Sequence, residues 1–166
     1  MVQTRQCQSK SKTAAEDNER RQCLMAACSV ATDQEFSQAI ELFDGVLNCA
    51  GAVDVRPPEV GMIMLRGRIG GDGAPFNVGE ATVTRAVVRL ETGEIGYSYL
   101  LGRSKQRART AAILDAIGQS SLERMVQLKE GFVAPVSKRV AAARRSKRAE
   151  TEATRVNFFT MVRGDD

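Results

Sequence analysis

Four basic residues near the middle of the chain have the types and spacing to bind an anion. Arg85 and Arg89 alternate with apolar residues in a β-rich segment, and Arg103 and Lys105 directly follow the next such segment. An arginine side chain can bind a carboxylate or a phosphate through two parallel hydrogen bonds. The pattern therefore allows a cationic patch at one end of a sheet. The alternative is that these side chains only cover the open face of an antiparallel sheet.

The absence of histidine excludes several kinds of catalytic site. The chain has 166 residues and no histidine, so it cannot by itself form a Ser-His-Asp triad, a His-ligated zinc site or an imidazole proton shuttle. Four carboxylates lie near the basic residues: Glu80, Glu91, Glu94 and Asp115. They show no evident pairing, so no general acid–base pair can be assigned. Catalytic residues stay unassigned, and no metal site is predicted.

A glycine-rich segment from Gly67 to Gly79 is a second place where an anion could bind. Glycine allows backbone N–H groups to approach a phosphate closely and to adopt positive φ. However, no Gly-Lys-Ser or Gly-Lys-Thr follows, and strands rather than a strand and a helix flank the segment, so it is not a Walker loop. A plain turn-rich connection is the other interpretation.

The cysteines and the first residues indicate a reducing, cytoplasmic setting. The four cysteines show no CxxC spacing and are interpreted as small buried side chains, apart from an exposed Cys7: they are Cys7, Cys23, Cys28 and Cys49. No apolar signal or membrane-spanning run is present, so no membrane partner is expected. Residues 1–12 are interpreted as a flexible leader, and residues 13–166 as a single domain.

Two amphipathic helices are predicted before residue 45. Each begins with a capping box, Thr13 with Glu16 and Thr32 with Glu35. Apolar residues then recur at i, i+3, i+4 and i+7. The first stripe is Leu24, Ala27, Cys28 and Ala31, and the second is Phe36, Ala39, Ile40 and Phe43. The helices should therefore cover about residues 14–30 and the segment from Thr32 to Gly45, as an antiparallel pair.

The middle of the chain predicts an antiparallel meander of three or four strands. Three β-rich segments, 60–69, 82–90 and 95–101, are separated by the glycine-rich segment and by a hairpin turn at residues 91–94. On the second strand, alternate positions from Thr82 to Leu90 form an apolar face, and Arg85 and Arg89 lie on the other face. With helices on both sides in sequence, the fold class is α+β.

The C-terminal third predicts helices, one of them strongly basic. Helices are expected at about 104–118, ended by Gly118, then at about 121–130, and from Pro135 to about residue 153. Residues 136–150 contain six basic residues and one acidic residue, Glu150. The basic residues are Lys138, Arg139, Arg144, Arg145, Lys147 and Arg148. This exposed helix (136–153) is interpreted as a solvated face or a docking surface for a protein, and the alternative is a nucleic-acid-binding or scaffold module acting through residues 136–150.

Residues 155–166 are apolar for a terminal segment. Terminal residues are usually polar and frayed, whereas this segment contains Val156, Phe158, Phe159 and Met161. We expect the segment to be docked, either as an added strand on the chain's own sheet or on a neighbouring subunit.

Three sequence segments resemble the PhnG family, a subunit of the bacterial carbon-phosphorus lyase system. They are GEATVTRAVVRL (79–90), GYSYLLGR (96–103) and TRVNFFTMVRGDD (154–166). The resemblance runs from about Met62 to Asp166. The chain departs from the family pattern at Ser104, where Asp is common, and at Arg109, where the family usually has Ala-Glu instead of Ala108-Arg109.

The resemblance implies a cytoplasmic subunit of a two-fold symmetric complex with PhnH, PhnI and PhnJ, joined by the ATP-binding-cassette proteins PhnK and PhnL. In that family, methylphosphonate displaces adenine from ATP and gives ribose 1-methylphosphonate 5-triphosphate. Mg-ATP would be a substrate of the complex, no cofactor would be bound by this chain, and the isolated chain would be inactive. Phosphate or partner contacts are expected from Arg85, Arg103, Lys105 and Arg163, and assembly contacts from Phe158, Phe159 and Met161.

Overall fold

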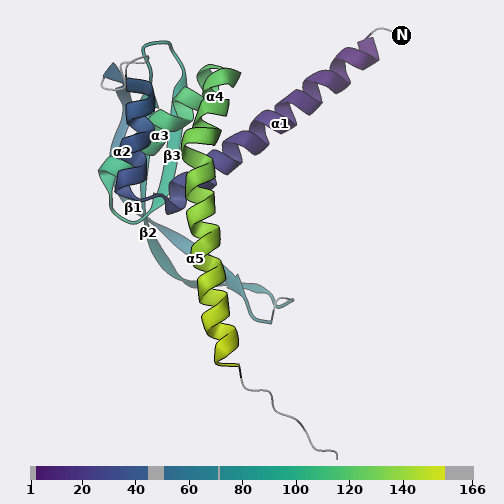
Figure 1. The fold of residues 1–166 in the computed structure, drawn as a ribbon, viewed down its shortest axis with the longest axis vertical. Helices are drawn as coiled ribbons and strands as arrows, with labels where there is room; N and C mark the ends of the chain where they lie inside the picture. The colour runs from purple at the N-terminus through teal and green to yellow at the C-terminus, as the bar shows by residue number, and fades with distance from the viewer. Residues whose placement is uncertain (1–2, 45–50, 71, 156–166) are drawn as a thin grey trace, which may run out of the picture.

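The computed structural model describes residues 3–44, 51–70 and 72–155. Its elements in chain order are α1 (Gln3–Val30), α2 (Asp33–Asp44), β1 (Val53–Arg68), β2 (Pro75–Arg89), β3 (Ile95–Leu101), α3 (Lys105–Ser120), α4 (Leu122–Leu128), a π-helical turn (Lys129–Val133) and α5 (Ala134–Ala153). The three strands form one antiparallel sheet in the order β1-β2-β3. Helices precede and follow this sheet (Figure 1), which confirms the α+β fold class.

The core lies between one face of the sheet and α3. On β2 the predicted apolar face is buried at Thr84, Ala86 and Val88, whereas Arg85 and Arg89 are exposed on the opposite face. The expected apolar body of α3 is buried as well. The predicted hairpin turn is also confirmed, with Gly93 at φ +103°, a conformation that glycine adopts without strain.

Two glycines allow close packing of helices and strands around this core. A Cβ atom on Gly96 of β3 would lie 1.9 Å from the carbonyl oxygen of Ala112 in α3. Gly118, expected to end its helix, lies inside α3 instead, where a Cβ would meet the side chain of Met125 at 2.7 Å. The prediction for Gly118 was therefore wrong, because this glycine accommodates the neighbouring helix rather than ending its own.

The strands β1 and β2 extend well beyond the predicted segments. β1 begins at Val53 and includes Pro57 and Pro58, where the pairing with β2 shifts register between Arg56 and Glu59. Proline lacks the donor for a ladder hydrogen bond and is tolerated in edge strands and at bulges, and β1 is an edge strand. Most of the glycine-rich segment belongs to these strands. Among the described residues of the segment, Gly70 has a positive φ.

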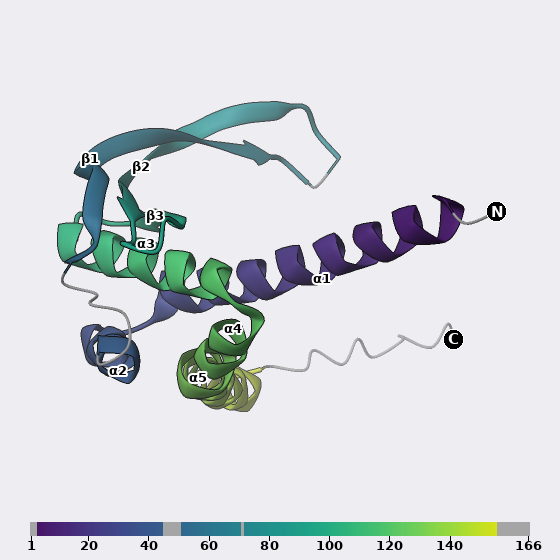
Figure 2. The ribbon, with the colours of Figure 1, turned by 90° about the horizontal axis from the view of Figure 1, so that it is seen from above.

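The N-terminal helices differ from the prediction in length and in orientation. α1 begins at Gln3 rather than near residue 14, so the sequence Thr13 to Glu16 lies inside the helix and does not start it. The assignment of residues 1–12 to a flexible leader stays a prediction. Figure 2 shows α2 almost end-on while α1 lies across the view, so the two helices cross steeply and are not antiparallel. The predicted apolar stripes of both helices are buried, with Ile40 partly buried.

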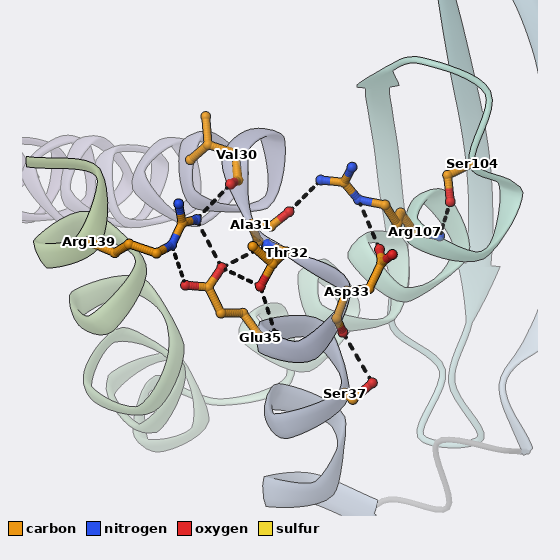
Figure 3. A network of polar contacts seen from close by, with 9 residues as sticks. All are labelled: Val30, Ala31, Thr32, Asp33, Glu35, Ser37, Ser104, Arg107 and Arg139. Carbon is orange, nitrogen blue, oxygen red and sulfur yellow. Dashed lines mark hydrogen bonds and ion pairs between the residues drawn. The ribbon is translucent and has the colours of Figure 1, made fainter. Parts of the chain in front are cut away.

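The short connection between α1 and α2 is held by two arginines from distant elements (Figure 3). The predicted capping box is confirmed: the backbone N–H of Thr32 donates to Glu35 Oε2 at 2.7 Å, and the N–H of Glu35 donates to Thr32 Oγ1. Arg139 of α5 binds both carboxylate oxygens of Glu35 and the carbonyl of Val30. Arg107 of α3 donates to the carbonyl of Ala31. These contacts fix the connection between the two helices to α3 and α5.

The Glu35 network predicts a dependence of stability on pH. Mainly because of its hydrogen bonds to Arg139, the pKa of Glu35 is lowered from 4.5 to about 2. The ionised carboxylate therefore stabilises the fold above about pH 4.5, and this contribution is lost as the pH falls toward 2. We expect Glu35→Gln to lower the free energy of unfolding by roughly 1–2 kcal/mol at pH 7. Urea unfolding of both proteins from pH 7 to pH 2.5 measures this difference.

The control for this experiment is Glu41→Gln, at an exposed position of the same helix. This change should leave stability nearly unaltered at every pH. The difference between wild type and Glu35→Gln should shrink between pH 4.5 and pH 2.5. A difference that stays constant across this range would contradict the role assigned to the ionised carboxylate.

The C-terminal helices follow the predicted order, with one addition. α4 passes through the π-helical turn into α5, whose first turn contains the expected Pro135. Val136 is buried, and the remainder of the helix is mostly exposed and projects away from the core (Figure 1). Arg139 is engaged by Glu35, so this part of the basic helix serves the fold. Among the described residues, no helix has both the length and the apolar character needed to cross a bilayer.

The two described cysteines differ from each other. Cys28 is buried, as predicted, and burial raises the pKa of its thiol to about 12. Cys23 is exposed, so the prediction of a buried side chain was wrong there. The predictions for Cys7 and Cys49 concern side chains outside the described part of the structure.

Candidate functional site

A groove between α1 and the outer face of the sheet gathers basic and aromatic side chains. Its cavity volume is about 670 Å³. Three arginines line it, each from a different element: Arg21 from α1, Arg56 from β1 and Arg85 from β2. Tyr97 and Tyr99 of β3 also line it. No carboxylate is among the described residues that line the groove.

Arg21 is fixed in the groove by a buried carboxylate. Its Nε donates to Asp115 Oδ1 at 2.8 Å and its Nη2 donates to Asp115 Oδ2 at 2.7 Å. Asp115 lies on α3, is 0% exposed, and also accepts hydrogen bonds from the backbone N–H of Tyr97 and from Gln119 Nε2. The hydrogen bond to Asp115 raises the pKa of Arg21 above its ordinary value. The guanidinium carbon lies 5.9 Å from the centre of the Tyr97 ring.

The other two arginines are less constrained. Arg85 Nε and Nη2 both donate to Glu59 Oε2, at 3.2 and 3.0 Å, and about half of each of these two side chains remains exposed. The side chain of Arg56 has no hydrogen bond or ion pair to any described residue. Tyr99 is 56% exposed beside them. The groove therefore offers guanidinium groups that still have donors available, next to exposed aromatic rings.

The structure separates the basic residues that the sequence grouped together. Arg85 pairs with Tyr99 in the sheet, while Arg89 pairs with Ile95 at the opposite end of β3. Arg103 and Lys105 follow β3 at the start of α3, and neither lines the groove. A single patch containing all four side chains is therefore not formed. The candidates Arg163, Phe158, Phe159 and Met161 lie outside the described residues.

The two departures from the family pattern have local structural roles. The Ser104 side chain caps α3 by accepting a hydrogen bond from the N–H of Arg107 at 3.3 Å. Aspartate and serine are both favourable N-caps, so this position keeps its function with either residue. Arg109 binds Asp54 Oδ1 at 2.8 Å and the carbonyl of Ala52 at 2.8 Å, and so fixes the start of β1 to α3.

The chemistry available in the groove is binding of an anion rather than proton transfer. Asp115 is completely occupied by hydrogen bonds, and within the described ranges no group of histidine, cysteine or acidic side chains could hold a metal ion. The sequence prediction did not include the pairing of Asp115 with Arg21. It also missed Arg21 and Arg56, because the contacts that assemble the groove join residues far apart in the chain.

The chain is similar to known proteins over most of its length. Residues 19–164 match the sequence model of a family described as "Phosphonate metabolism protein PhnG". A protein of Rhizobium meliloti (strain 1021) is 57% identical over 136 residues, which cover 82% of this chain and 84% of that protein. It is named alpha-D-ribose 1-methylphosphonate 5-triphosphate synthase subunit PhnG. The family match begins much earlier in the chain than the segments that first suggested it.

Proposed function

Because the chain belongs to the PhnG family of phosphonate metabolism proteins, we propose that it is a subunit of an alpha-D-ribose 1-methylphosphonate 5-triphosphate synthase. This complex transfers methylphosphonate to the ribose C1 of ATP and releases adenine. Its partners in this step are PhnH, PhnI and PhnL, and the larger two-fold symmetric assembly includes PhnJ and PhnK. The absence of histidine supports catalytic groups on a partner subunit.

The observation that carries this proposal is an exposed apolar ribbon, formed by the distal parts of β1 and β2 at residues 60–69 and 75–82. The ribbon projects from the body of the chain (Figures 1 and 2). Met62 of β1 is 71% exposed, and Ile69, which directly follows β1, is 75% exposed. Phe76 and Val78 of β2 are also exposed. A two-stranded ribbon is marginally stable by itself, and exposed apolar patches commonly mark interaction surfaces. An assembly partner would bury these side chains.

The proposal is tested by reconstitution with and without this chain. We expect the complete set of subunits to release adenine from Mg-ATP and methylphosphonate, while neither this chain alone nor the set lacking it does so. Met62→Lys combined with Met64→Lys should reduce co-purification with the partners at least tenfold, since burial of each methionine contributes roughly 1.5–3 kcal/mol. Leu122→Lys, at an exposed apolar position of α4, is the control.

Two outcomes would contradict the proposal. Full adenine release without this chain would show that it is not a required subunit. Equal recovery of partners by the ribbon variant and the control would show that the ribbon is not the assembly surface. A chain ending at Arg155 gives the same comparison for the predicted assembly residues Phe158, Phe159 and Met161.

The alternative of a nucleic-acid-binding module rests on α5. The exposed basic side chains of α5 favour it, although Arg139 is committed to Glu35. Binding through phosphate contacts weakens steeply with added salt. Salt-dependent RNA binding that is lost when Arg144 and Arg145 are both changed to glutamine would support this alternative.

A further inference from the structure

We propose that the groove between α1 and the sheet is a binding site for a nucleoside triphosphate. The proposal rests on the proposed function, because that reaction starts from a nucleoside triphosphate, but the site itself follows from the side chains in the groove. Its volume of about 670 Å³ lies within the range typical of small-ligand sites. Its lining combines apolar and aromatic surface with a few polar groups, which is the usual composition of such sites.

The three arginines give the groove its preference for a polyanion. Asp115 occupies two donors of Arg21 and holds that side chain in one orientation, while its remaining donors stay available. The guanidinium group of Arg85 is held by a single oxygen of Glu59, and that of Arg56 has no hydrogen bond or ion pair to the described residues. Planar guanidinium groups bind phosphate oxygens through pairs of hydrogen bonds. Three of them from three elements would hold the phosphates of one ligand.

The two tyrosines and two amides suit the base. A nucleobase can stack on an exposed aromatic ring, whichever base it is, and Tyr99 is 56% exposed at the groove. Asn18 and Gln22 of α1 line the opposite wall and carry both donors and acceptors for the edge of a base. Arg21 already lies over the Tyr97 ring. The base would therefore lie against Tyr99, with the phosphates toward Arg56 and Arg85.

The chain provides a reporter that is specific for this site. It contains two tyrosines and no tryptophan, and both tyrosines line the groove. Full-length chain labelled with 3-fluorotyrosine should therefore give two ¹⁹F NMR signals, assigned with Tyr97→Phe and Tyr99→Phe. We expect Mg-ATP to shift both signals in a saturable way. Adenosine should bind at least tenfold more weakly, because it lacks the phosphates.

Matched variants test the assignment of the groove residues. Arg56→Gln should weaken Mg-ATP binding at least tenfold, and Arg148→Gln, which removes the same charge from the exposed part of α5, should leave it unchanged. Tyr99→Ala should weaken binding, whereas Tyr99→Phe should retain it. Circular dichroism establishes whether each variant is folded. If Arg56→Gln does not fold, Arg56→Lys replaces it as the test variant.

The failure of this proposal can be distinguished from failure of the proposed function. No saturable shift of either signal at millimolar Mg-ATP would overturn the groove site, even if the chain is required for adenine release with its partners. Equal weakening by Arg56→Gln and Arg148→Gln would also overturn it, because the binding would then be non-specific attraction of charge. A chain that binds Mg-ATP in the groove but is dispensable for adenine release would overturn the proposed function alone.

Discussion

Arg21→Met is expected to destabilise the chain by about 3–5 kcal/mol. This substitution leaves the carboxylate of Asp115, which is 0% exposed, without its charged partner. Although the Arg21 side chain is 39% exposed, the carboxylate is buried, and removing the partner of a buried charge typically costs this much because that charge is left uncompensated. The hydrogen bonds from Tyr97 N–H and Gln119 remain, but neither carries a charge. Urea or thermal unfolding followed by circular dichroism measures the loss, at about 2–4 °C per kcal/mol for a chain of this length.

The preceding residue provides a matched control. Arg20 lies on the same helix and forms ion pairs with Asp17 and Glu16, but these carboxylates are about half exposed or more. Exposed ion pairs contribute about 0–1 kcal/mol, and arginine and methionine have similar helix propensities. Arg20→Met should therefore cost less than about 1 kcal/mol. If the two variants lose the same small amount of stability, the interaction of Arg21 with Asp115 does not stabilise the fold as inferred.

Local signals in the sequence were sufficient to predict the elements around the core. The capping box of Thr32 and Glu35 depends on residues three apart, and the structure contains it. β3 has the predicted bounds, Ile95–Leu101, because a hairpin turn and the start of α3 limit it closely. On β2, alternation with period two placed Ala86 and Val88 in the core and Arg85 outside it. These predictions succeeded because each depends on the near neighbours of a residue.

Predictions that depended on distant contacts were less successful. Gly118 carries the sequence signal of a helix end, but it permits close packing of Leu24 and Met125 against α3. The partner of Asp115 lies 94 residues away on α1, and no local pattern indicates that pairing. The first β-rich segment was predicted at residues 60–69, but β1 begins at Val53, because an edge position and a shift of register accommodate Pro57 and Pro58 within it. The groove was missed for the same reason, since four separate elements form it: α1, β1, β2 and β3.

The arginines fall into two groups: those whose side chains connect parts of the fold, and those whose donors remain available for a ligand. Arg107, Arg109 and Arg139 each donate to a backbone carbonyl that is distant in the sequence, and so connect separate parts of the fold. Their substitution would alter the scaffold. Arg56 makes no such contact with the described residues, and Arg85 is held only by a half-exposed glutamate. Arg56 and Arg85 are therefore the better places to remove charge without unfolding the chain.

Gly96→Ala is expected to be among the most damaging single-atom additions in the chain, with a cost of about 3 kcal/mol or more. The added Cβ would lie 1.9 Å from Ala112 O and 2.5 Å from Ala116 N, which are both backbone atoms of α3. A backbone cannot turn aside as a flexible side chain can, so the whole helix must move away from β3. That movement would open the contact between α3 and β3, where Ala112 and Ala116 are buried. Thermal unfolding followed by circular dichroism measures the effect.

Gly61→Ala separates this steric effect from the ordinary consequences of replacing a strand glycine. Gly61 lies in β1, and a Cβ atom there has no atom within 4 Å. Neither Gly61 nor Gly96 has positive φ, so neither substitution strains the backbone, and the two differ in the space around the new atom. Gly61→Ala should be neutral or slightly stabilising, by up to about 1 kcal/mol. A Gly96→Ala protein as stable as Gly61→Ala would contradict the close approach of α3 to β3.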